Sequence, residues 1–181
     1  ILDKAGQKGT GLWTVISALE LGVPVPTIYA SLNARVMSSL KEQRKEVENL
    51  LPFDVDREFD FGNISNSMKP LFDAVVLSTI ASYAQGMDIL KEASTTYNYD
   101  LNMPSIAQIW KGGCIIRSKL LKRIQDAYQK DPNLKNLIFD SWFNNQISNK
   151  INNLSYVVSA ASKASIPVPC LSSTLDYLNG Y

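Results

Sequence analysis

The sequence predicts an all-α fold, and three observations support this. Apolar residues recur at helical spacing through most of the 181 residues, and no stretch alternates convincingly as a strand does. Glycine and proline punctuate these runs. The 45% apolar content is enough to bury the core of one domain. We therefore expect a single all-helical domain over residues 1–181, with an internal helix-turn-helix repeat.

The first two expected helices flank a proline-rich turn. One runs from about Thr10 to Leu21, and Gly22 is placed as its stop. The second begins near Thr27 and ends in a charged, solvated stretch over 41–48. Its apolar stripe comprises Ile28, Leu32, Val36 and Leu40.

The longest expected helix lies in the middle of the chain. Residues 52–67 combine Pro, Gly, Asp and Asn and are typical of an irregular crossing segment. A helix over about 69–97 follows, and its wide apolar face predicts a central position. That face comprises Phe72, Val75, Val76, Ile80, Tyr83, Met87 and Leu90.

The rest of the chain, after residue 97, predicts five shorter helices. Each is a periodic run between turn-forming residues. Their approximate bounds are 106–110, 118–129, 134–144, 149–165 and 170–178.

A short internal similarity helps to distinguish residues needed for packing from residues of a candidate site. Shifted by 143 positions, residues 13–18 and 23–26 overlie 156–161 and 166–169, a hint of duplication. In the second copy Lys8, Thr10 and Arg35 are replaced by Ile151, Asn153 and Leu178. Packing alone therefore does not require the two cations.

Composition excludes several classes of function. A net charge of +1 argues against a nucleic-acid partner and a basic membrane patch, and no apolar run approaches membrane-spanning length. The chain has no histidine, which leaves no plausible metal site, and no Gly-x-Gly-x-x-Gly follows a strand-like run. With only Cys114 and Cys170, a disulfide framework is not expected and a cytoplasmic location fits better.

The start of the chain contains a candidate anion site. Gly6, Gly9 and Gly11 surround Lys8 and Thr10, and glycines allow positive φ and close approach of the backbone to a ligand. Lysine and threonine there would face an anion. The alternative is a solvated loop followed by an N-cap threonine.

Arg35 offers a third candidate side chain, at the edge of the apolar stripe of the second helix. A guanidinium buried there must be paired. Its partner could be a structural carboxylate such as Asp3 or Glu20, or a bound phosphate.

Four segments, in order, resemble one enzyme family. They are the opening run from Ile1 to Trp13, residues 80–86, residues 109–118 and residues 166–170. Together they make the whole chain similar to the C-terminal domain of the decarboxylating 6-phosphogluconate dehydrogenases. Two departures are Leu12 and Lys111, where many members have lysine and arginine.

The resemblance implies a cytoplasmic, homodimeric oxidoreductase of the pentose phosphate pathway. Without a metal, it would use NADP to oxidise 6-phosphogluconate and decarboxylate it to ribulose 5-phosphate. Lys8 and Thr10 would contact the substrate phosphate, and Arg35 would clamp it.

The same resemblance implies that no catalytic or cofactor-binding residue lies in this chain. Family members carry the catalytic lysine upstream, after a Rossmann domain that holds NADP, and a C-terminal tail reaches into the other subunit. This chain alone is then expected to be inactive. The alternative is a catalytically inert helical dimerisation module.

Cysteine and tryptophan residues receive structural interpretations. Cys114 has no histidine to activate it, so we expect a small buried residue between two closely packed helices. Trp13, Trp110 and Trp142 are expected to be core or dimer anchors.

Overall fold

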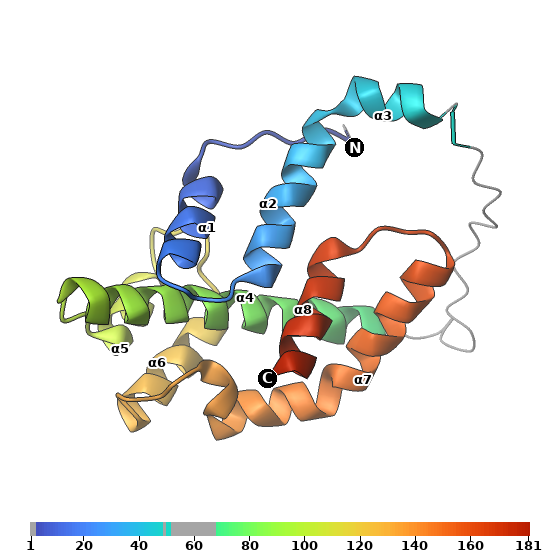
Figure 1. Ribbon diagram of the computed structural model, residues 1–181. Helices are drawn as coiled ribbons and strands as arrows, with labels where there is room; N and C mark the ends of the chain where they lie inside the picture. Colours follow the sequence, from blue (N-terminus) through green and yellow to red (C-terminus); the bar gives the residue numbers. More distant parts are fainter. Residues whose placement is uncertain (1–2, 49, 52–67) are drawn as a thin grey trace.

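The computed structural model describes residues 3–48, 50–51 and 68–181, and within these ranges every regular element is helical (Figure 1). The predicted all-α fold is confirmed. The crossing segment expected over 52–67 lies outside the described residues.

Helix α4 (Lys69–Tyr97) forms the centre of the domain and crosses the middle of Figure 1. Helices α7, α8 and α2 all pack against it. Leu77, Ile80, Ala84 and Met87 are completely buried on α4 and belong to the main hydrophobic cluster. The predicted central position is therefore confirmed.

The predicted apolar face of α4 was partly wrong. Phe72 and Val75 are 65% and 52% exposed. The small residues Ala74, Ala81 and Ala84 are instead completely buried. Because alanines allow neighbouring helices to approach closely, the packed face follows them, and larger side chains on the adjacent face remain at the surface.

Helices α5 (Met103–Ile109) and α6 (Leu120–Lys130) pack on each other. A single helix, α7 (Ser141–Lys163), then replaces the two helices expected over 134–144 and 149–165. A short 3₁₀ turn, η2 (Leu137–Phe139), precedes it.

A side-chain cap explains where α7 begins. The Asp140 carboxylate accepts hydrogen bonds from the backbone N–H groups of Trp142 (2.9 Å) and Phe143 (3.3 Å). The carboxylate thus starts the helix at residue 141. No proline or glycine follows before residue 163 to interrupt it.

Two helix-turn-helix connections have the same backbone geometry. One connection joins helices α1 (Thr10–Glu20) and α2 (Pro26–Ser39), and the other joins α7 and α8 (Pro169–Gly180). Gly22 and Ser165 both have left-handed φ angles, 69° and 52°. The residues before the two proline starts, Val25 and Val168, have φ of −129° and −130°. Duplication as the origin of this likeness stays a prediction.

Helix α2 ends at Ser39, before Leu40, the last residue of its expected apolar stripe. Leu40 departs from helical geometry (φ −83°, ψ 38°), and α3 (Lys41–Glu48) follows as a separate helix without a buried residue. Val36 and Leu40 are 40% and 38% exposed, so half of the predicted stripe is not core. The charged stretch is exposed as predicted except at Lys41 and Arg44, which are half-buried.

Candidate functional site

The start of α1 presents an open helix N-terminus. Gly9 is the N-cap residue, with φ 95°, and no side chain caps the helix. Trp13 donates its backbone N–H to the Gly9 carbonyl (3.0 Å), while the first turn contains no acidic residue. The amide groups of an uncapped first turn carry partial positive charge and favour an anion.

This geometry corrects two expectations about the glycine-rich run. Of its three glycines only Gly9 has a positive φ. Thr10 is the first helical residue, so it does not act as the N-cap in the alternative interpretation. Its exposed side chain remains available beside the uncapped amides.

Residues 3–9 lead from the end of α2 across to the start of α1 (Figure 1). The Ala5 N–H donates to Ser38 Oγ (2.7 Å). At the other end, a Cβ added to Gly11 would lie 3.6 Å from Leu32 Cδ1, so α1 begins against α2. These two contacts bracket Lys8 on one segment and Arg35 on the other.

Helical spacing places the two α2 residues that make these contacts on one side of the helix, together with Arg35. Leu32, Arg35 and Ser38 are three residues apart, and residues at that spacing neighbour one another along a helix surface. The structure therefore brings together the parts of the chain that carry Lys8, Thr10 and Arg35.

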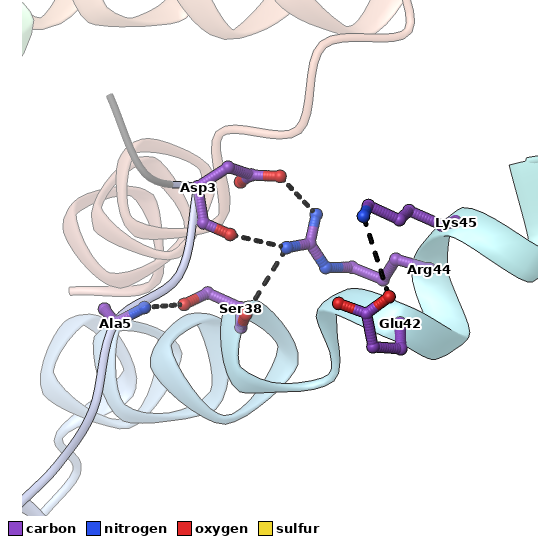
Figure 2. A network of polar contacts seen from close by, with 6 residues as sticks. All are labelled: Asp3, Ala5, Ser38, Glu42, Arg44 and Lys45. Carbon is purple, nitrogen blue, oxygen red and sulfur yellow. Dashed lines mark hydrogen bonds and ion pairs between the residues drawn. The ribbon is translucent and has the colours of Figure 1, made fainter.

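An arginine clamp anchors the segment that carries Lys8 (Figure 2). Arg44 on α3 binds the Asp3 carboxylate through Nη1 (3.0 Å), while Nη2 donates to the Asp3 carbonyl (2.9 Å) and to the Ser38 carbonyl (3.3 Å). The hydrogen bond and the charge of Arg44 hold the pKa of Asp3 below its usual value. Asp3 thus pairs with Arg44 and not with Arg35.

Arg35 is exposed, which corrects its expected place at a buried stripe edge. Within the described residues neither Arg35 nor Lys8 forms an ion pair. Both charges are hydrated, so no structural carboxylate is needed to compensate them. Lys8 directly precedes the uncapped start of α1, and an exposed cation at that position favours an anion.

A large groove lies beside the start of α1. Its volume is about 1050 Å³, and α1, α2, α4 and the start of α8 contribute to its walls. Thr10 and Trp13 line it from α1, and Val75 and Tyr83 line it from α4. Thr10 therefore connects the uncapped helix start with the groove, whereas Lys8 and Arg35 lie outside its lining.

Two of the remaining candidates, Cys114 and Trp142, lie outside this site, whereas Trp13 and Trp110 line the groove. Cys114 is half-buried in the connection between α5 and α6, so the expected position between packed helices was wrong. Trp142 packs edge-on against Phe143 (5.0 Å between ring centroids), whereas Trp13 is 64% exposed. In the described part of the chain, no cluster of potential metal ligands occurs, and no helix is long and apolar enough to cross a bilayer.

The departure at Lys111 has a structural explanation. Its ammonium group donates to Gln108 Oε1 (2.8 Å) and to Gln125 Oε1. Lys111 thereby ties the end of α5 to α6 and has no place in the candidate site.

Sequence reasoning missed the clamp residues. It assigned Arg44 to a solvated charge run, yet its partner Asp3 lies 41 positions away. No local pattern signals such a pair. Ser38, which holds both the segment and Arg44, also showed no sequence signal.

Comparison with known proteins identifies the fold and its family. A family model described as 6-phosphogluconate dehydrogenase, C-terminal domain, matches residues 1–181. The chain belongs to this family. The resemblance seen in the sequence is therefore confirmed for the 6-phosphogluconate dehydrogenase C-terminal domain.

Relatives from distant organisms share the whole chain. It is 47% identical to a decarboxylating 6-phosphogluconate dehydrogenase of Synechocystis and 42% identical to a human one, over 100% of this chain and 37% of each relative. The 6-phosphogluconate dehydrogenase C-terminal domain described above thus spans little more than a third of these proteins.

A solved structure has the same fold. The Plasmodium falciparum 6-phosphogluconate dehydrogenase superposes with a TM-score of 0.92 at 40% identity, over 99% of this chain and 38% of that chain. It was solved in its apo form and in complexes with NADP+ and with 6-phosphogluconate. Those ligands are bound by that protein.

Proposed function

We propose that this chain is part of an NADP-dependent 6-phosphogluconate dehydrogenase. The enzyme would oxidise 6-phosphogluconate and release CO2, giving ribulose 5-phosphate and NADPH, as in the pentose phosphate pathway. Family membership supports this reaction. The observation that supports the chain's own part is the position of two exposed cations, neither of which forms an ion pair among the described residues. Lys8 directly precedes the uncapped start of α1. Arg35 lies on the stretch of α2 between the contacts at Leu32 and Ser38.

Lys8, Thr10 and Arg35 bind the phosphate of the substrate in this proposal. A guanidinium fork matches two phosphate oxygens, an ammonium adds a mobile point charge, and the Thr10 hydroxyl and the first-turn amides donate further hydrogen bonds. Binding energy from this remote phosphate helps to orient the reacting end of the sugar acid. None of the three transfers a proton.

NADP and the catalytic groups belong to other parts of the enzyme in this proposal. The described residues contain no strand followed by a glycine-rich loop and a helix, which is the unit that holds a dinucleotide. We place NADP in a preceding Rossmann domain, as the family resemblance implies. The catalytic residues lie between that domain and this one, and a C-terminal tail follows.

The same proposal includes a homodimer in the cytoplasm. Leu19, Ile109 and Ile115 are 72%, 70% and 100% exposed. Large apolar side chains exposed on several elements are typical of a surface that packs against more protein. This apolar surface supports a subunit interface as the second task of the domain.

The experiment that tests the phosphate site uses Arg35→Ala in the full-length enzyme. Loss of a charged, bidentate contact is expected to raise the KM for 6-phosphogluconate about 10- to 100-fold, with the KM for NADP nearly unchanged. Lys8→Ala is expected to have a milder effect because an ammonium is less directional. Steady-state kinetics measures both.

Lys163→Ala is the control, because it removes one exposed positive charge from α7. It should leave both KM values unchanged. Equal losses for substrate and NADP in Arg35→Ala would contradict the phosphate assignment.

The second candidate function is a dimerisation module without ligand affinity, and the exposed apolar side chains favour it. Calorimetric titration of the 181-residue chain with 6-phosphogluconate, with sedimentation on the same sample, separates the two. Saturable binding that Arg35→Ala abolishes supports a phosphate site in this domain. A dimer without binding supports the module.

A further inference from the structure

A buried glutamine on α4 caps the N-terminus of α2. Gln85 on α4 is completely buried, and its Oε1 accepts hydrogen bonds from the backbone N–H groups of Thr27 (3.1 Å) and Ile28 (3.3 Å). The Gln85 Nε2 donates to Thr27 Oγ1 (3.0 Å). One side chain therefore makes three hydrogen bonds to the first turn of α2.

These bonds complete the hydrogen bonding of the α2 N-terminus. Val25, the N-cap residue, supplies no side-chain acceptor, and Pro26 has no N–H group. Tyr29 donates to the Val25 carbonyl (2.9 Å), so the amides of Thr27 and Ile28 remain, and Gln85 binds both. Gln85 does what an N-cap side chain normally does, although it comes from 58 positions away.

The hydrogen-bond network continues to α8, and each of its hydrogen bonds has a defined donor. Thr174 Oγ1 donates to the Cys170 carbonyl (2.8 Å), so in the 3.1 Å contact between the two threonine hydroxyls Thr27 is the donor. Thr27 then accepts from Gln85 and donates to Thr174. Thr27 and Thr174 are 3% and 0% exposed, so water does not compete for these bonds.

The network fixes the helix that carries Arg35. Arg35 lies eight residues after Thr27, about 12 Å along the axis, and an α-helix transmits a shift or rotation at its first turn over that distance. At its far end α2 is held by Ser38, which binds Ala5 and Arg44. Among the described residues, the buried hydrogen bonds of Gln85 are the only ones of these contacts that join α2 to the central helix α4.

We propose that Gln85 is a positioning residue for the sugar-phosphate site, because its side chain sets the position and rotation of α2 and hence the place of Arg35. This inference rests on the proposed function. Gln85 touches no substrate; it acts through α2. A buried amide that satisfies two backbone donors and one hydroxyl is specific in geometry, and an apolar residue of equal size would leave both amides unsatisfied.

The test is a double-mutant cycle in the full-length enzyme with Gln85→Met and Arg35→Ala. Alone, Gln85→Met is expected to raise the KM for 6-phosphogluconate on the order of tenfold and to change the KM for NADP less than twofold. In the Arg35→Ala background it should raise the KM for 6-phosphogluconate no further, because the side chain that it positions is gone. A merely structural role would give equal effects in both backgrounds.

Leu121→Ala is the stability control. Leu121 is completely buried on α6, which packs mainly on α5, so its truncation lowers the melting temperature without altering α2. Its KM for 6-phosphogluconate should equal that of the wild type when assayed below the transition. If Gln85→Met does not fold, Thr27→Val, which removes only the hydroxyl, should show a smaller rise with the same dependence on Arg35.

The outcomes separate this inference from the proposed function. A KM for 6-phosphogluconate that rises in Arg35→Ala but not in Gln85→Met or Thr27→Val overturns the positioning role alone. An unchanged KM in Arg35→Ala overturns both.

Discussion

Two arginines close in sequence have different tasks because their surroundings differ. The guanidinium group of Arg44 binds Asp3 and Ser38 and so anchors the segment before α1. Arg35 is exposed and forms no ion pair among the described residues. The residue types of the candidate site could be predicted from the sequence. The clamp could not, because Asp3 and Arg44 meet only in the folded chain.

The clamp predicts local protection of the segment before α1. In Arg44→Ala, we expect the Ala5 amide, which donates to Ser38 Oγ, to exchange its hydrogen several-fold faster because residues 3–9 separate more often from α2. Hydrogen exchange read by NMR measures this. Gln43→Ala, on the same helix, is the control. Equal exchange of the Ala5 amide in both variants would show that Arg44 does not hold residues 3–9 against α2.

Asp88 predicts a dependence of stability on pH. Burial raises its pKa to about 6, although Asn136 donates a hydrogen bond to one oxygen; the other oxygen has no partner among the described residues. A carboxyl group whose pKa is higher in the folded state stabilises the fold at low pH, and this contribution is lost as pH rises from about 4 to about 6.

Asp88→Asn should therefore stabilise the protein at pH 7.5, by up to about 2 kcal/mol, and have little effect at pH 4. The neutral amide keeps an acceptor for Asn136 and avoids a buried charge. Urea unfolding at the two pH values measures the difference. A gain of the same size at both would show that ionisation of Asp88 is not its cause.

At the scale of elements, helix existence was easier to predict than helix boundaries. The periodic patterns located α1, α4, α6, α8 and the start of α2 closely, because these boundaries coincide with proline, glycine or a change of polarity. The end of α2 at Ser39 was missed. The start of α7 was missed even though its signal, an aspartate before a helical run, is local. The exposed flank of α4 had no local signal, since neighbouring helices decide which face is covered.

The cap of α7 predicts the cost of its removal. Asp140→Ala leaves two backbone N–H groups without their acceptor and should lower the free energy of unfolding by about 1 kcal/mol. Asp176→Ala, an exposed position inside α8, is the matched control and should change it by less than about 0.5 kcal/mol. Urea denaturation compares them. Equal losses would mean that the Asp140 carboxylate does not cap α7.

In the whole molecule, the fold explains how segments distant in sequence meet around the candidate site. Residues 3–9 contact α2, a buried glutamine binds α2 to α4, and α8 joins the same hydrogen-bond network. The sequence could predict the fold class, because helical periodicity is local. It could not predict which helices meet, because contacts such as that of Thr27 with Thr174 span 147 positions.

We propose that this domain binds the phosphate of the substrate, and the substrate preference of Arg35→Ala tests this claim. Wild-type enzyme and Arg35→Ala are each assayed with 6-phosphogluconate and with gluconate, which lacks the phosphate. We expect the preference for the phosphorylated substrate in kcat/KM to fall at least about tenfold in Arg35→Ala, with activity on gluconate unchanged. An undiminished preference, or an equal loss for both substrates, would contradict the claim.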